Sequence, residues 1–178
     1  THGDKDQESS LTLTEHLGIF ASEIQVSLMN KDVDVAVHSL KDLPITHLTK
    51  LKIAAIPNRE DPRDILYHPR GLSLNALPEG SVVGTCSLRR TGQLRNLRRD
   101  LIVKDIRGNV ETRMGKVHSG EYDAIVLAAA GMIRLKYDIS NYYKFNYDEI
   151  IPVPGQGALA VEIRKNNKKL EKLLKEID

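Results

Sequence analysis

The chain has 178 residues, of which 40% are hydrophobic and 28% charged, proportions typical of a globular protein. Its single cysteine, Cys86, excludes an internal disulfide framework and fits a reducing compartment, so we expect a cytoplasmic location. No apolar run approaches the roughly 20 residues of a membrane helix, and the polar start "THGDKDQESS" is unlike a signal peptide. The cysteine and six scattered histidines have no spacing typical of a metal site.

The net charge of +2 is unevenly distributed along the chain. Between Ser87 and Arg113, seven arginines and one lysine stand against three acidic residues, a local excess of +5, and the rest of the chain carries about −3. Concentrated arginine suggests an anionic partner. Nucleic acid fits poorly, because tryptophan is absent, phenylalanine occurs twice, and no groove-entering motif is present. The pattern favours a small polycarboxylate instead.

Helical spacing of apolar residues predicts an amphipathic helix over roughly 15–31. The stretch "VDVAVHSLKDLP" then predicts a strand over 33–37, in which every second residue is a valine, followed by a polar loop. A second strand is expected over 51–57. The polar segment "NREDPRD" (58–64) follows it and is expected to join two domains.

Strands and helices alternate in the remainder of the chain. Strands are expected over 81–85, 101–106, 122–130 and 157–164. Helices are expected over 87–100 and 109–120, capped by Ser87 and Asn109, and in the C-terminal tail. This alternation indicates an α/β fold with largely parallel sheets. We expect two α/β domains of periplasmic-binding-protein-like type around a cleft. Domain 1 would comprise 1–57 plus 157–178, and domain 2 would comprise 58–156.

Three polar stretches follow the expected strands, where ligands of open α/β sheets bind. They are "HSLKDLP", "TCSLRR" and "RGN". Arg89 and Arg90 fall in the first turn of a predicted helix, a position that favours anions over cations. Arg107 and Arg113 repeat this arrangement at the next helix. Together they predict a carboxylate or phosphate clamp, with incidental surface charge as the alternative.

Three further arginines, Arg95, Arg98 and Arg99, point away from the leucines expected to be buried in the same helix. We therefore expect them to form a solvated face. The leucines expected to be buried are Leu94, Leu97 and Leu101.

Six stretches in this order and spacing resemble one family. They are "DVAVHSLKDLP", "REDPRD", "GTCSLRR", "DIRGNVETR", "GEYDAIVLAAAG" and "PGQGALAVEIR". Together they resemble hydroxymethylbilane synthase, also called porphobilinogen deaminase, over essentially the whole chain. The resemblance implies a transferase of haem and porphyrin biosynthesis that polymerises porphobilinogen into the linear tetrapyrrole hydroxymethylbilane and releases ammonia. It also implies a covalent dipyrromethane cofactor and a monomer without nucleic-acid or membrane partners.

The resemblance also implies the roles of individual residues. Asp42 matches the family's catalytic aspartate, where a carboxylate stabilises the positive charge that develops as ammonia leaves. The expected cofactor-binding residues are Lys41, Thr85, Ser87, Arg89, Arg90, Arg107, Gly108 and Arg113. The expected substrate-binding residues are Arg89, Arg113, Arg134 and Gln156. Thr1 and Asp4 fit the family's T-x-G-D stretch.

The chain departs from the family pattern at two positions. Leu17 stands where many members carry a lysine, and Cys86 stands where a serine is common. We expect the opening strand and the third domain, with its cofactor-bearing cysteine, to lie outside this chain, so that the 178-residue piece would be inactive alone. The alternative function is a non-catalytic two-lobe protein that binds a small polycarboxylate, which would need the arginines but not Asp42.

Overall fold

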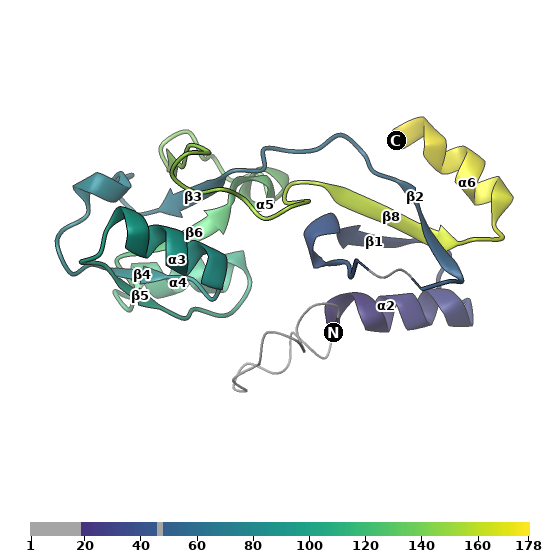
Figure 1. Ribbon diagram of the computed structural model, residues 1–178, viewed down its shortest axis with the longest axis horizontal. Coiled ribbons are helices and arrows are strands. Elements are labelled where there is room, and N and C mark those ends of the chain that lie inside the picture. Colours follow the sequence, from purple (N-terminus) through teal and green to yellow (C-terminus); the bar gives the residue numbers. More distant parts are fainter. Residues whose placement is uncertain (1–18, 46–47) are drawn as a thin grey trace. The chain divides into compact units, whose positions relative to one another are not determined.

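The computed structural model describes residues 19–45 and 48–178 (Figure 1). The chain forms two compact units. The first contains the described residues up to Glu60 together with Gly157–Asp178, and the second is Asp61–Gln156. The expected sites at Thr1, Asp4 and Leu17 lie outside the described residues. In the described part, no helix combines the length and apolarity needed to cross a membrane.

The first unit is a three-stranded sheet with helices on both faces. Its strands lie in the order β1, β8, β2, and both outer strands run antiparallel to β8. Figure 1 shows α2 and α6 on opposite sides of this sheet. The elements are α2 (Ile19–Asn30), β1 (Ala36–Ser39), the 3₁₀ turn η1 (Leu40–Asp42), β2 (Leu51–Ala55), β8 (Leu159–Arg164), α6 (Lys168–Leu174) and η3 (Lys175–Ile177).

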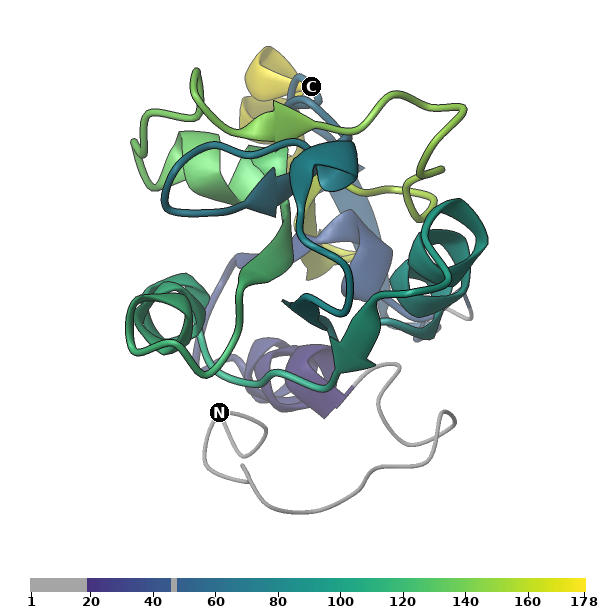
Figure 2. The same ribbon diagram turned by 90° about the vertical axis from the view of Figure 1, so that its left-hand side faces the viewer.

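The second unit is a five-stranded mixed sheet in the order β5, β4, β6, β3, β7. In Figure 2, α3 and α4 lie on opposite sides of its strands. The strands are β3 (Asp64–Tyr67), β4 (Val82–Gly84), β5 (Ile102–Lys104), β6 (Ala124–Ala128) and β7 (Tyr143–Lys144). The helical elements are η2 (Leu74–Ala76), α3 (Leu88–Leu97), α4 (Val110–His118) and α5 (Ala129–Arg134).

Two apolar clusters hold the second unit together, one on each side of its sheet. The cluster on the α4 side includes Ile125 and Met132, and the cluster on the α3 side includes Leu94 and Phe145. All four of these side chains are fully buried. Strands β3 and β6 are buried on both faces. Their apolar residues therefore follow one another without a break instead of alternating with polar residues.

The predicted helix starts are confirmed by side-chain caps. Ser87 accepts a hydrogen bond from the Arg90 amide at the start of α3, and Asn109 accepts one from the Thr112 amide at the start of α4. Each cap satisfies one amide that has no partner within its helix. The sequence therefore predicted these boundaries correctly, because capping depends on neighbouring residues alone.

The strand predicted over 33–37 lies instead at Ala36–Ser39, with its inward face reversed. Ala36 and His38 are buried, whereas Val37 is 55% exposed. Polar contacts on either side of the predicted strand account for the shift. The backbone before the strand is held by the guanidinium of Arg164, and His38 turns toward a buried carboxylate on β8. Apolar alternation therefore gave the wrong phase here.

The expectation of largely parallel sheets is wrong for most of the strand pairs. Within the described residues, β4 pairs in parallel with β5 and β6, and the other pairs are antiparallel. Two strands, β3 and β7, were not predicted. The antiparallel strand β3 begins within the segment expected to be a polar joint.

Two side chains at the C-terminal end of α3 also differ from expectation in their exposure. Arg98 is not part of a solvated face, because its guanidinium donates to the Asp100 carboxylate and to the carbonyl oxygens of Leu74 and Leu77. Leu97, expected to be buried, is 36% exposed, since α3 ends there.

Candidate functional site

Asp42 lies in the 3₁₀ turn η1, directly after β1. The Leu40 amide of the turn donates a hydrogen bond of 3.0 Å to the carbonyl oxygen of Ala158, the residue directly before β8. Leu43 then packs into the sheet against Ala160. Anchored on both sides, the turn presents Lys41 and Asp42 at the end of the strand.

The Asp42 carboxylate reaches solvent but has protein around it. The resulting desolvation raises the pKa of Asp42 above its ordinary value, and the positive charge of Lys41 partly opposes this shift. A carboxylate with a raised pKa is a better proton acceptor than an ordinary one. The turn therefore offers a negative charge and a proton-accepting group.

In the second unit, two cationic loops lie side by side at the carboxyl ends of β4 and β5. These strands are parallel neighbours, with Gly84 opposite Lys104. The loops also touch directly, because the Cys86 thiol donates to the Ile106 carbonyl oxygen at 2.8 Å. The helices α3 and α4 begin from these two loops, so their N-terminal amides lie at one edge of the sheet.

Arg89 and Arg90 are both bonded to Asp64, a fully buried carboxylate at the start of β3. Arg89 Nη2 lies 2.8 Å from Oδ2, and Arg90 Nη2 lies 2.6 Å from Oδ1. Burial alone raises the pKa of Asp64, but the charges and hydrogen bonds of the two arginines outweigh it and hold the pKa below its ordinary value.

The two arginines differ in exposure. The Arg90 side chain is 9% exposed and also donates to the Val126 carbonyl oxygen. Its hydrogen bonds to Asp64 and Val126 are both to buried groups of the second unit, so its role is structural. The Arg89 side chain is 24% exposed. It forms the solvent-facing side of the Asp64 network.

Arg113 lies one turn into α4, and its Nε donates to the Gly108 carbonyl oxygen at 2.6 Å. It makes no ion pair within the part of the chain that the structure describes. Burial lowers the pKa of Arg113, with the Cys86 thiol opposing the shift and Arg90 adding to it. A partly buried guanidinium without an acidic partner is suited to a carboxylate ligand.

The other expected binding residues of the second unit have varied surroundings. Thr85 is buried, and its hydroxyl accepts a hydrogen bond from the Ser87 amide. Arg107 is half-buried in the loop before α4, and Arg134 is exposed at the end of α5. Gln156 is buried, and its amide nitrogen donates to the Pro62 carbonyl oxygen and to Asp64.

Asp64, the residue that joins Arg89, Arg90 and Gln156, was not predicted as a site residue from the sequence. One signal was available: an aspartate immediately before the apolar run "ILY", at the start of a strand. Buried carboxylates are almost always paired, so such an aspartate predicts a nearby cation. The sequence alone could not say which of the many arginines would be that partner.

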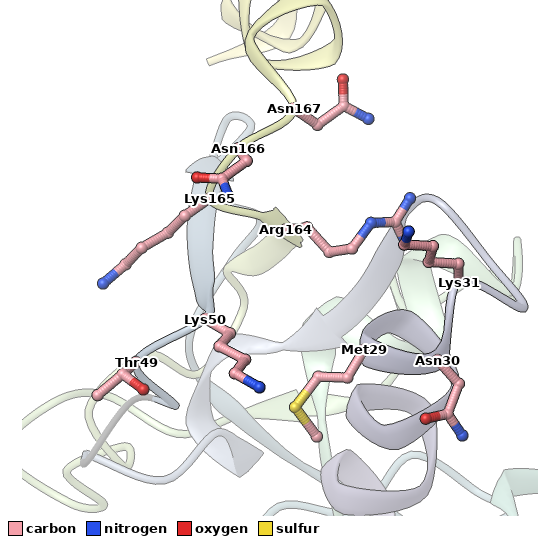
Figure 3. A pocket seen from close by; sticks show the side chains of 9 residues that line it. All are labelled: Met29, Asn30, Lys31, Thr49, Lys50, Arg164, Lys165, Asn166 and Asn167. Carbon is pink, nitrogen blue, oxygen red and sulfur yellow. The ribbon is translucent and has the colours of Figure 1, made fainter.

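A pocket in the first unit contains none of the predicted site residues. It has a volume of about 950 Å³ and is lined by several cations, including Lys31, Lys50, Arg164 and Lys165 (Figure 3). It lies at the Arg164 end of β8, whereas the Asp42 turn adjoins the Leu159 end. Arg164 is already bonded to Asp34 and to the carbonyl oxygens of Leu28 and Val33.

Solved structures with this fold define its class. A protein from Bacillus subtilis described as an amino-acid ABC transporter extracellular-binding protein matches 97% of this chain and 84% of its own, with a TM-score of 0.56 and 16% identity. A methionine-binding lipoprotein of the same species matches 88% and 74%, with a TM-score of 0.55 and 16% identity. The chain therefore has the α/β fold of periplasmic-binding-protein-like domains.

The family is shown by sequence. A model described as "Porphobilinogen deaminase, dipyromethane cofactor binding domain" matches residues 1–172, and the chain belongs to the porphobilinogen deaminase family. The relative from Thermus thermophilus is 51% identical, over 87% of this chain and 52% of its own length. That from Brevibacillus brevis is 43% identical, over 100% of this chain and 58% of its own length. The chain thus spans about half the length of these curated relatives.

The residues present fit an acidic cofactor. Dipyrromethane, the cofactor named by the matching model, carries carboxylate side chains in this family, and the half-buried Arg113 has no acidic partner among the described residues. The neighbouring starts of α3 and α4 add backbone amides. Arg113, Arg107 and Arg89 would hold the carboxylates.

Proposed function

We propose that the full-length protein is a hydroxymethylbilane synthase, a transferase that joins porphobilinogen units head to tail and releases ammonia. The single observation that carries the proposal is the family match over residues 1–172. The geometry supports it, because the chain supplies both a carboxylate of raised pKa and a cluster of arginines for an acidic substrate. The dipyrromethane supplies the pyrrole end to which new units are added.

Within this proposal, Asp42 is the catalytic residue. Loss of ammonia leaves a positive charge on the substrate, and a carboxylate held nearby stabilises that charge. Its raised pKa also suits it to take up the proton lost when the new carbon–carbon bond forms. Lys41 lies beside it and would contact a carboxylate of the cofactor.

We propose Arg89, Arg107, Arg113 and Arg134 as the groups that bind pyrrole carboxylates. A guanidinium binds a carboxylate through two parallel hydrogen bonds, which fixes its orientation as well as its position. Thr85, Ser87 and Gly108 would shape the loops that carry these arginines. Gln156 and Arg90 would act through Asp64, to which both are bonded.

We also propose that the two compact units are the two domains expected from the sequence. The protein would be a cytoplasmic monomer without a nucleic-acid partner. The low cysteine content supports the cytoplasmic location, and the few aromatic residues argue against a nucleic-acid partner. Gel filtration and cell fractionation test it directly.

The decisive experiment supplies porphobilinogen to the purified full-length protein and measures ammonia and hydroxymethylbilane. Asp42→Asn is expected to lower turnover by roughly 10²–10³-fold or more, because it removes the stabilising charge. Asp32→Asn, which alters an exposed carboxylate of the same unit, is the matched control and should retain activity. A protein that binds porphobilinogen but releases no ammonia would instead be the non-catalytic binding protein.

A further inference from the structure

A buried polar cluster joins three elements of the first unit, one of which, β1, leads directly into the Asp42 turn. Its centre is Glu162 on β8, which is fully buried, and Gln25 of α2 and His38 of β1 are 3% and 7% exposed. Gln25 Nε2 donates to both Glu162 oxygens, at 3.0 and 3.2 Å. His38 Nε2 lies 3.3 Å from Oε2 but makes no hydrogen bond within the part of the chain that the structure describes.

The cluster sits in the centre of the sheet. Glu162 lies opposite Ala36 on one side and Ile53 on the other, so its side chain shares a face with both neighbouring strands. That face packs against α2, where Leu28 contacts Ala36 and Leu51. A carboxylate in such a position is strongly unfavourable unless its neighbours satisfy it.

This requirement explains the phase of β1. The valines of the strand would place Val37 inward, yet Val37 is exposed and His38 is buried. Since side chains alternate at period two, turning His38 inward settles which face every residue of the strand occupies. The contact between His38 and Glu162 therefore selects which of the two faces of β1 is buried. Buried polar groups fix the register of packed elements in other folds as well.

The phase of β1 in turn fixes the catalytic turn. Leu40 follows His38 by two residues, and its amide bonds to the carbonyl oxygen of Ala158, the residue directly before β8, the strand that carries Glu162. Leu43 can then enter the sheet against Ala160, which leaves Asp42 outward. With the opposite phase, this chain of contacts could not form.

We propose that Glu162, together with His38 and Gln25, is a positioning unit that holds the Asp42 turn in its working geometry. The effect on catalysis rests on the proposed function, whereas the effect on the geometry of the turn does not. Misplacement of a catalytic group by about 1 Å can lower a rate by about 10²-fold, so such a unit would act on turnover more than on substrate binding.

The test compares variants of the full-length protein. Glu162→Gln and His38→Leu are expected to lower kcat by about tenfold or more with KM changed by less than about twofold, because the turn is displaced but the arginines are untouched. His38→Gln keeps a polar side chain next to Glu162 and should retain most of kcat. Ile163→Val is the matched control, since Ile163 is buried next to Glu162 but faces the other side of β8.

Hydrogen exchange gives a readout that does not require activity. The Leu40 and Leu43 amides should exchange about tenfold faster in Glu162→Gln and His38→Leu than in Ile163→Val, because the hydrogen bonds of the turn open more often. Should Glu162→Gln fail to fold, the two His38 variants still decide. Unchanged exchange and kcat in His38→Leu, or an equal loss in Ile163→Val, would overturn the proposal. If the wild type makes no product, the proposed function fails, and exchange alone decides whether the cluster positions the turn.

Discussion

Asp64 shows how one buried side chain organises a whole loop region. Its two oxygens accept hydrogen bonds from Arg89 and Arg90 at the start of α3 and from Gln156 at the end of the second unit. Arg89 is oriented on both sides, because Nη2 donates to Asp64 and Nη1 donates to the Ile151 carbonyl oxygen at 2.6 Å, while the side chain remains 24% exposed. The same carboxylate therefore serves stability and, under the proposed function, the orientation of a binding arginine.

Asp64→Asn is expected to destabilise the protein by roughly 3–5 kcal/mol, because it leaves the buried Arg90 without its counter-charge. Asp61→Asn, which weakens the more exposed pair with Arg63, should cost about 0–1 kcal/mol. Urea unfolding at neutral pH measures both. Equal small losses would show that the Asp64 pairs contribute little.

The pH dependence of stability follows from the lowered pKa of Asp64. A carboxyl group whose pKa is lower in the folded state stabilises the protein above its unfolded pKa, near 3.8, and loses this contribution as pH falls through the folded value. Wild-type stability should therefore fall in acid below about pH 4. Asp64→Asn should show a shallower fall, and an identical slope would contradict the assignment.

Lys41 should set the pH range in which Asp42 works. If the carboxylate form is active, activity is lost as pH falls through the raised pKa of Asp42, so the acidic limb lies above pH 3.8. The charge of Lys41 lowers that pKa, and Lys41→Gln should therefore move the limb to higher pH. The measurement is kcat/KM against pH, and a limb that stays in place or moves to lower pH would count against this coupling.

At the scale of elements, the loop before α4 depends on a single glycine. Gly108 has a φ of +113°, and a Cβ there would lie 2.7 Å from Thr112 Cγ2 and 2.8 Å from its Cβ. Only glycine adopts this conformation readily. The loop in turn provides the carbonyl oxygen that orients Arg113.

Gly108→Ala should destabilise the protein by about 1–3 kcal/mol, the usual range for a residue forced into such a conformation. Gly115→Ala in the same helix is the control, since a Cβ there meets nothing within 4 Å. It should stabilise by roughly 0.5–1 kcal/mol, because alanine loses less entropy in a helix. Urea unfolding of both variants decides, and a neutral Gly108→Ala would refute the argument.

At the scale of the whole molecule, the second unit is one continuous segment, whereas the first is built from two. The Asp64 network ties the two ends of this segment together, since Gln156 donates to Pro62 and Asp64. The unit also has its own two apolar clusters. It therefore contains the features of an independently folding domain.

Residues 61–156 expressed alone should unfold cooperatively in urea. Residues 65–155, which lack both Asp64 and Gln156, should not, because Arg90 is then buried without its counter-charge. The unfolding of both segments can be followed by amide hydrogen exchange and by tyrosine fluorescence, which is not masked because the chain contains no tryptophan. Equal stability of the two segments would show that the network is dispensable for folding.

The sequence by itself determined the alternation of strands and helices, the caps at Ser87 and Asn109, the family, and the clustering of arginine. These depend on neighbouring residues or on motifs read along the chain. Only the tertiary structure decided the phase of β1, the partners of Arg89 and Arg90, and the antiparallel strands. The physical reason is that these features depend on contacts between segments that are far apart in the sequence. Buried carboxylates need partners, and Asp64 and Glu162 find hydrogen-bond donors in such distant segments. The direction in which two strands pair is likewise settled between distant segments.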